Sequence, residues 1–296
     1  MEKPVFYPEG ASTFNVVHRR DYCNTQIPPH IHDGIELYLS LSPLPNVLLG
    51  NKVLTAEPGT LVLIPPFCVH RLFDKTDELY DRYILSINAS WLNRIIPQGD
   101  TCYAYLQDSG HPLLLFPPAP AMHAMQENLE RLLSLHDHSF FEAATCFLEY
   151  MSSVDALAQH NSGNQTHVYI STTQQTVADI IRYLDEHIGE NVSLRDLSEH
   201  FYLHPDYISR IFKKHTNTTV GSYITLRKTA LAQQLLSEGY TVTQAQLMTG
   251  YSSYAHFART FKQQTGIPPG AYRNRGIQRR LNSDSPAIPP AAASPP

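Results

Sequence analysis

The chain contains one short sequence pattern twice, at an offset of 49 residues. Residues 208–223 read Ile-Ser-Arg-Ile-Phe-Lys-Lys-His-Thr-Asn-Thr-Thr-Val-Gly-Ser-Tyr, and residues 257–272 read Phe-Ala-Arg-Thr-Phe-Lys-Gln-Gln-Thr-Gly-Ile-Pro-Pro-Gly-Ala-Tyr. Arg, Phe, Lys, Thr, Gly and Tyr recur at matching places in the two copies. Because these positions divide into an apolar and a basic class, the repeat indicates that one helical unit occurs twice.

The first copy has the pattern of an amphipathic helix that follows another helix. Ile208, Ile211 and Phe212 have the i, i+3, i+4 spacing of one buried helix face. The opposite face carries polar side chains, those of Asp206, Ser209, Arg210 and Lys213. Upstream, Ser193 and Asp196 have the spacing of a capping box, which marks the start of the preceding helix. The first copy therefore predicts a helix, a short turn and a second helix.

The second copy repeats this arrangement. Apolar residues again mark a leading helix, at Val242, Ala245 and Met248. On the trailing helix Phe257 and Phe261 share the inner face, whereas Arg259 and Lys262 fall on the outer face. A helix-turn-helix unit binds DNA by placing its second helix in a major groove. Two such units in matching phase predict a DNA-binding domain.

These residues resemble the DNA-binding domain of the AraC-type (AraC/XylS) family of bacterial transcription regulators, over roughly residues 174–276. The motifs that carry the resemblance are Ser209–Lys214, Gly250–Tyr251, Phe257–Lys262 and Gly266–Arg273. The resemblance implies two helix-turn-helix units joined by a helix from about Ser222 to Leu236. It also implies a regulator that reads successive major grooves of double-stranded promoter DNA.

Three residues depart from the family pattern. Asn217 replaces the usual Gly after the first recognition helix, and Asn is the next best residue for a left-handed helix cap. His204 stands where a Ser normally caps that helix, and a neutral imidazole can accept the same hydrogen bond. Gln246 replaces a small Ala in the second unit. We therefore expect looser packing in the second unit and specificity from the first recognition helix.

The expected DNA contacts follow from the exposed positions of the two units. We expect Arg210 to make a bidentate guanine contact, with Asp206 and Ser209 reading neighbouring base edges. Phosphate or mixed contacts are expected from Lys213, Arg259 and Lys262, and Lys214 and Tyr254 are further expected DNA contacts. Residues 174–280 hold thirteen Lys and Arg against eight Asp and Glu, whereas residues 1–173 hold nine against eighteen. The chain's net charge of −5 thus conceals a basic end, as phosphate binding requires.

The N-terminal half has the pattern of a small β-barrel. Short apolar segments alternate with Pro and Gly, at residues 35–41, 47–49, 52–56, 60–64 and 80–87. Residues 122–133 and 140–151 have helical spacing and are expected to close this domain. His30, His32 and Glu36, followed by a lone His70, resemble the arrangement in cupins. The expected fold is therefore α+β, with a cupin-like barrel and an all-α DNA-binding domain.

Three uses of these histidines stay open. The first is a polar pocket for a small-molecule effector, such as a sugar or sugar derivative, lined by Tyr22, His30, His32, Glu36, Tyr38 and His70. The second is a metal centre of a cupin enzyme, because three His and one Glu suit iron, manganese, zinc or nickel. The third is a purely structural role in an architectural DNA binder. The Gly that precedes the first His in metal cupins is missing, so no metal, cofactor or catalytic residue is expected.

Length and composition favour two domains and no membrane segment. We expect residues 1–160 to form the effector-binding and dimerisation domain, 161–173 a linker, 174–280 the DNA-binding domain and 281–296 a disordered tail. The chain has no long apolar run and no signal-peptide layout, which predicts a cytoplasmic protein. Either closing helix could form the seam of a homodimer, and family resemblance adds RNA polymerase as a further partner.

Overall fold

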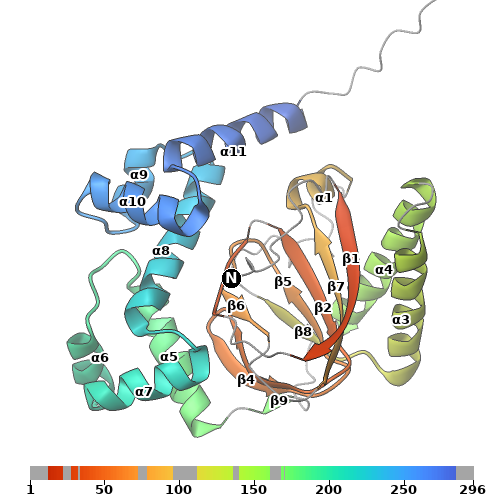
Figure 1. The fold of residues 1–296 in the computed structure, drawn as a ribbon, viewed down its shortest axis with the longest axis horizontal. Coiled ribbons are helices and arrows are strands. Elements are labelled where there is room, and N and C mark those ends of the chain that lie inside the picture. Colours follow the sequence, from red (N-terminus) through yellow and green to blue (C-terminus); the bar gives the residue numbers. More distant parts are fainter. Residues whose placement is uncertain are drawn as a thin grey trace, which may run out of the picture.

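The chain folds into a sheet-rich part followed by a helical part. The structure is a computed structural model that describes residues 13–22, 28–32, 34–72, 79–95, 112–135, 140–160, 168–169 and 171–284. Figure 1 shows the two parts side by side, with the strands on the right and the later helices on the left. The expected α+β organisation is confirmed.

Two antiparallel sheets make up the N-terminal part. The larger sheet has the order β1-β7-β2-β5-β8, and its strands are β1 (Phe14–Tyr22), β7 (Leu79–Ile87), β2 (Ile35–Ser40), β5 (Leu61–Ile64) and β8 (Leu113–Leu115). The smaller sheet has the order β6-β3-β4-β9, and its strands are β6 (His70–Arg71), β3 (Leu44–Leu49), β4 (Lys52–Ala56) and β9 (Val168–Tyr169). In the described residues the predicted barrel therefore takes the form of two sheets that do not close into one.

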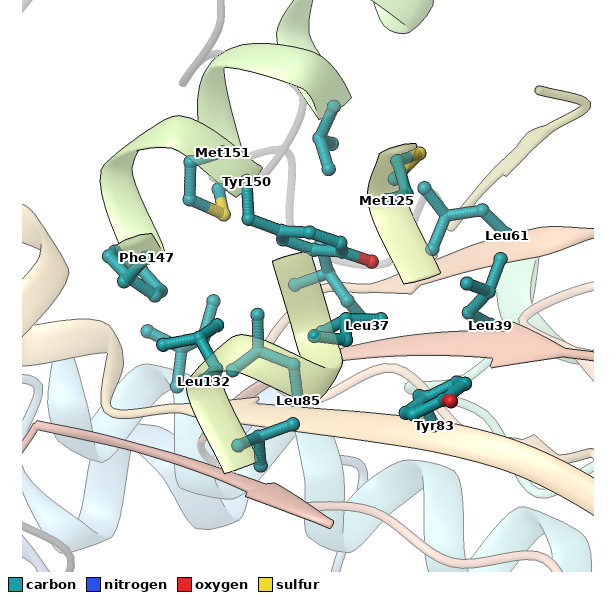
Figure 2. Packing of buried hydrophobic residues seen from close by; sticks show 14 of the residues in the cluster. Leu37, Leu39, Leu61, Tyr83, Leu85, Met125, Leu132, Phe147, Tyr150 and Met151 are labelled. Carbon is teal, nitrogen blue, oxygen red and sulfur yellow. The ribbon is translucent and has the colours of Figure 1, made fainter. Parts of the chain in front are cut away.

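The alternation of side chains along β2 separates two apolar cores. Leu37 and Leu39 point to the face of the larger sheet that is covered by α3 (Ala119–Ser134) and α4 (Phe140–His160). Figure 2 shows Tyr150 of α4 and Met125 of α3 directed at this face. Fully burying one such apolar side chain stabilises the fold by about 1.5–3 kcal/mol. The two helices that were expected to close the domain thus pack against the sheet face that carries Leu37 and Leu39.

Tyr38 belongs to the opposite phase of β2 and faces the second core. This second core is formed by residues of both sheets, including Leu44, Leu54 and Val62. The register pairs Tyr38 with Val62 on β5 and with Ile84 on β7. Glu36, Tyr38 and Ser40 alternate with Leu37 and Leu39 along β2 and lie on its opposite face. His30 and His32 precede this strand, because β2 begins only at Ile35.

The helical part contains the two predicted units. The first consists of α6 (Leu194–Phe201) and α7 (Pro205–Thr216), and the second of α9 (Val242–Met248) and α10 (Tyr254–Thr265). They are joined by α8 (Val220–Ser237), which extends a little beyond the expected range of 222–236. The flanking helices are α5 (Thr172–Glu186) and α11 (Pro269–Asp284), and a shorter helix, α1 (Ala89–Ile95), follows β7.

Local capping signals fix the ends of the first unit. Ser193 and Asp196 form the predicted capping box at the start of α6. The Nδ1 of His204 accepts a hydrogen bond from the Asp206 backbone N–H at 3.3 Å, so the imidazole replaces the missing hydroxyl cap of α7. Asn217 ends α7 with a φ of 58°, in the left-handed region that Asn tolerates.

The second unit accommodates Gln246 better than the sequence suggested. This side chain is buried, and its Nε2 donates a hydrogen bond to the Tyr251 carbonyl at 2.7 Å. Because the buried amide of Gln246 has a hydrogen-bond partner, it stabilises the turn between α9 and α10. The structure thus gives no reason to expect looser packing at this residue.

Several predicted boundaries differ slightly from the structure. Lys52–Ala56 is reproduced as β4, whereas β1, β6, β8 and β9 were not predicted. Residues 168–169 form a strand and α5 begins at Thr172, both within the expected linker of 161–173. The expected tail begins inside α11, and residues 285–296 lie outside the described residues. Among the described helices, none combines the length and apolar character of a membrane span.

Candidate functional site

The first candidate site is the exposed face of α7, which we call the reading face and define as Asp206, Ser209, Arg210, Lys213 and Lys214. Four of these residues are exposed and Ser209 is half-buried. The opposite side of α7 is apolar, and its Ile208 and Phe212 are fully buried. The Arg210 guanidinium lies 5.5 Å from the centre of the Tyr207 ring, a cation–π contact that holds it near the start of the helix.

The second unit has the same two-sided arrangement. Phe257 and Phe261 of α10 are each only 1% exposed, whereas Arg259 and Lys262 are exposed on the other side. Tyr254, at the first turn of α10, is 55% exposed. All the residues expected to contact DNA are therefore accessible, apart from the half-buried Ser209.

Close backbone contact holds the second unit against the segment that precedes the first unit. Gly250, in the turn between α9 and α10, has a φ of +72°, and a Cβ built on it would lie 2.1 Å from the Gly189 carbonyl oxygen. From α8, the Lys228 Nζ donates to the Glu190 carbonyl at 3.1 Å and lies 5.4 Å from the centre of the Tyr251 ring. These contacts join the segment between α5 and α6, which directly precedes the first unit, to α8 and to the turn of the second unit.

The third feature is a group of side chains that we call the histidine cluster: His30, His32, Glu36 and His70. One ring nitrogen from each histidine lies within 4.8 Å of the others. The Glu36 Oε2 lies 3.3 Å from the His32 Nε2 and 3.4 Å from the His70 Nε2. His30 and His70 are also joined by an isolated β-bridge. The structure thus brings together four of the six residues expected in the effector pocket.

Burial and neighbouring groups shift the pKa values of the cluster. Burial, followed by the nearby His70 and His32, lowers the pKa of His30 to about 3. Burial alone would raise the pKa of Glu36, but hydrogen bonds and charges from His32 and His70 hold it well below its usual range. The cluster therefore combines a neutral imidazole at His30 with an ionised carboxylate, which is a suitable set for binding a cation or a polar ligand.

The two tyrosines predicted for the pocket lie in different surroundings. Tyr38 is 1% exposed in the core between the sheets, where burial raises its pKa. Tyr22 is 58% exposed at the end of β1, and β7 separates β1 from β2 in the sheet. The structure therefore places Tyr38 behind the cluster and does not bring Tyr22 to it.

A contact between the sheet-rich part and the first DNA-binding unit was not predicted. We call it the domain joint. On the sheet side it comprises Leu48, Val53, Val69 and Arg71, and on the helical side it comprises α5 and the buried face of α7. The fully buried Arg71 donates from its Nη2 to the His215 carbonyl at 2.7 Å, in the last turn of α7. A positive charge is favourable at this helix end, where carbonyls lack helical partners.

Sequence reasoning missed Arg71 and Gly189 as members of functional contacts. A buried Arg beside His70 carries no local signal that distinguishes it from an exposed Arg on a strand. Gly189 follows α5 in a stretch without periodicity, and only Gly250, within the family motif, marks the other half of their contact. Both contacts join segments that are distant in sequence, so spacing does not reveal them.

Comparisons with known proteins agree with this arrangement. Residues 16–148 match the family model described as an AraC-like ligand binding domain, and residues 197–275 match a helix-turn-helix domain. The multiple antibiotic resistance protein MarA of Salmonella typhimurium is 30% identical over 104 residues, which are 35% of this chain and 82% of MarA. The regulatory protein PocR of the same organism is 26% identical over 131 residues, which are 44% of this chain but only 42% of PocR.

One of the solved structures that the chain matches is ToxT from Vibrio cholerae with an unsaturated fatty acid bound. Its TM-score is 0.39 at 13% identity, and the match covers 88% of this chain and 95% of that chain. The two family models lie in the order in which the structure places its sheets and its helix-turn-helix units. The chain belongs to the AraC-type family of DNA-binding transcription regulators, with a ligand-binding domain at its N-terminal side.

Proposed function

We propose that this protein binds specific promoter sites in double-stranded DNA and that a small-molecule effector in its N-terminal domain controls this occupancy. Arg210 reads guanine, and Asp206 and Ser209 read neighbouring base edges. Lys213, Lys214, Tyr254, Arg259 and Lys262 contact phosphates or make mixed contacts. The exposure of these side chains opposite a buried apolar face supports the assignment. DNA as a partner places the action of the protein in the cytoplasm.

The observation that carries the regulatory part of the proposal is the domain joint. The sheet that contributes Leu48 and Val53 shares one apolar core with Ile208 and Phe212 of α7. A ligand that favours one arrangement of this sheet therefore also favours one position of α7. Such a ligand changes DNA occupancy only by the difference between its affinities for the two arrangements.

The histidine cluster is the best-supported effector site, with the four side chains of His30, His32, Glu36 and His70. Polar groups of this kind suit a hydroxyl-rich ligand, which keeps a sugar or sugar derivative among the candidates. Tyr38 lies in the core between the sheets, two residues from Glu36 on the same strand, whereas Tyr22 would need a ligand that extends to the end of β1. We propose a regulatory and not a catalytic use of this site.

We further propose that the protein acts as a homodimer through α4 and contacts RNA polymerase at the promoter. Phe141 is 80% and Leu148 is 51% exposed, and they are two helical turns apart on α4. Large apolar side chains exposed in one helical line suit a symmetric helix–helix seam. The buried side of α4 packs on the larger sheet, so this seam leaves the domain core intact.

The experiment that tests the proposal is a gel-shift titration of the full chain on its own upstream DNA, with and without candidate carbohydrates. We expect binding that weakens steeply with salt and a midpoint that shifts with an effector. Arg71→Met removes the hydrogen bond to His215 and should reduce the effector's influence while DNA binding persists. Equal affinity for upstream DNA and for a scrambled duplex would refute the sequence-specific part, and an unchanged effector response in Arg71→Met would refute the role of the joint.

A further inference from the structure

The histidine cluster has a uniform hydrogen-bonding pattern on its outer side. The Nδ1 of His30 lies 3.3 Å from the Pro28 carbonyl, that of His32 lies 3.0 Å from the Gly34 carbonyl, and that of His70 lies 3.0 Å from the Cys68 carbonyl. A carbonyl only accepts, so each Nδ1 carries the proton and donates it. In the neutral tautomer this leaves every Nε2 with a lone pair. Histidines that ligate metals are oriented in this way by a backbone carbonyl behind the ring.

The inner side of the cluster brings these lone pairs to a carboxylate. The Nε2 atoms of His32 and His70 lie 3.3 Å and 3.4 Å from the same oxygen of Glu36. Lone pairs facing a carboxylate oxygen repel each other unless a positive charge lies among them. A proton on the ring nitrogen, as in a hydrogen bond from the His32 Nε2 to Glu36, is one source of that charge, and a cation bound among the ring nitrogens is another. A single cation satisfies all these atoms at once.

The distances fit a four-coordinate transition metal. With Zn–N and Zn–O bonds of about 2.0–2.1 Å, neighbouring ligand atoms of a tetrahedron are about 3.3–3.4 Å apart. This is the separation of the Glu36 oxygen from the two histidine nitrogens. The third histidine, His30, offers a ring nitrogen within 4.8 Å of those of His32 and His70. Three imidazoles and one carboxylate also match the ligand preference of Zn²⁺.

One short strand connects this cluster to the DNA-binding part. Val69, His70 and Arg71 are consecutive, and alternate side chains of an extended segment point to opposite sides. His70 points into the cluster, whereas Val69 joins the apolar core of the domain joint and Arg71 reaches the end of α7. A ligand that fixes the His70 ring therefore also fixes the backbone that positions Arg71.

We propose that His30, His32, Glu36 and His70 bind a divalent transition-metal ion of the Zn²⁺ type, and that its occupancy positions α7 through Val69 and Arg71. The second half of this proposal rests on the proposed function, whereas metal binding stands on the cluster alone. The metal has a regulatory role here, so the site requires no open coordination position. The metal then takes the place of a sugar as the ligand of these four side chains, and it corresponds to the metal alternative that the sequence left open, in a regulatory and not a catalytic use.

The test of the site is a Zn²⁺ titration of the metal-free full chain, repeated with Co²⁺, whose tetrahedral complexes absorb visible light strongly. We expect one ion per chain. His32→Ala and Glu36→Gln should each weaken binding at least ~10-fold, since even outer partners of metal ligands change affinity by this factor. His123→Ala is the matched control, because His123 is 75% exposed on α3, outside the cluster, and should leave affinity unchanged.

Folding is checked separately from binding. Circular dichroism of each metal-free variant should match the wild type, because His32 and Glu36 retain some exposure, at 12% and 17%. Excess Zn²⁺ should raise the thermal midpoint of the wild type and of His123→Ala, and not that of the two cluster variants. If His32→Ala and Glu36→Gln bind Zn²⁺ as tightly as the wild type, or if the wild type binds none, the metal site is wrong.

A DNA-binding experiment distinguishes the metal proposal from the proposed function as a DNA-binding regulator. Gel shifts with metal-free and Zn²⁺-loaded wild type should differ in midpoint, and the difference should vanish in His32→Ala. Specific binding that ignores Zn²⁺ in a protein that binds the ion would overturn the coupling and leave the DNA-binding function standing. Zn²⁺ binding without specific DNA binding in either form would instead overturn the proposed function and leave the metal site standing.

Discussion

The contact between Gly250 and Gly189 predicts an unusually costly Gly-to-Ala substitution. A methyl group at Gly250 would lie 2.1 Å from the Gly189 carbonyl oxygen and 2.6 Å from its carbonyl carbon, and both atoms belong to backbone. The position also has a φ of +72°, a conformation that costs an L-residue about 1–2 kcal/mol. Forcing apart a packed contact adds about 1–3 kcal/mol. Gly250→Ala should therefore lower the free energy of unfolding by about 2–5 kcal/mol.

Gly266 provides the matched control for this substitution. It has a φ of +81° after α10, but a Cβ there would meet no atom within 4 Å. Gly266→Ala therefore carries only the conformational cost, and the two variants should differ by about 1–3 kcal/mol. With a urea dependence of about 2 kcal/mol per molar, the midpoints should differ by about 0.5–1.5 M.

Urea unfolding of the full chain measures this difference. Helix content by circular dichroism follows mainly the DNA-binding part, whereas fluorescence of the single tryptophan, Trp91, follows the sheet-rich part. The loss in Gly250→Ala should be visible first in the helical signal. Equal midpoints for the two alanine variants would refute the close backbone approach between Gly250 and Gly189, and with it the contact between the second unit and the segment that follows α5.

Three further predictions concern DNA, assembly and pH. Arg210→Ala should weaken binding to a specific site by about 1–3 kcal/mol and relax its sequence preference in gel shifts, whereas Arg20→Ala, on β1, should change neither. A double Phe141→Ser and Leu148→Ser variant should have half the wild-type mass in light scattering, and an unchanged mass would exclude α4 as the dimer seam. Burial, followed by neighbouring cationic side chains, lowers the pKa of His215 below its usual 6.5. The contribution of His215 to the free energy of unfolding is therefore fully present above pH 6.5 and is lost as the pH falls through the lowered pKa. His215→Gln should flatten this decline, as measured by thermal unfolding at several pH values.

Local patterns in the sequence were sufficient for the helical part. The stripe of Ile208, Ile211 and Phe212 gave α7 its buried face, and the residues at Ser193, His204 and Asn217 gave its unit the observed caps. These signals act within a few residues of each other, so spacing alone reveals them. The same holds for β2, where alternate side chains lie on opposite faces and Leu37 and Leu39 share one face.

Other elements were missed for identifiable reasons. β1 is a mostly accessible edge strand, with residues such as Arg20 and Tyr22 facing solvent, so it lacks the alternation of a half-buried strand. The sequence did not show how the histidine cluster is held together, because His30 and His32 precede β2 and a bridge joins His30 to the distant His70. The bond from Arg71 to His215 joins residues 144 positions apart. No pattern of neighbouring residues contains that information.

The position of α7 explains how a ligand-binding domain can act on DNA without covering the reading face. Arg210 and Lys213 stay exposed, while the opposite face of the same helix shares its core with Leu48, Val53 and Val69 of the sheet-rich part. A steric block of DNA would require the sheet on the exposed side. In the described residues, a change in the sheet reaches the helical part through α5 and α7, by apolar packing and by the Arg71 contact at the end of α7. Regulation through this joint should therefore change where the first unit sits relative to the second, and its effect on affinity should be largest on DNA that both units contact at once.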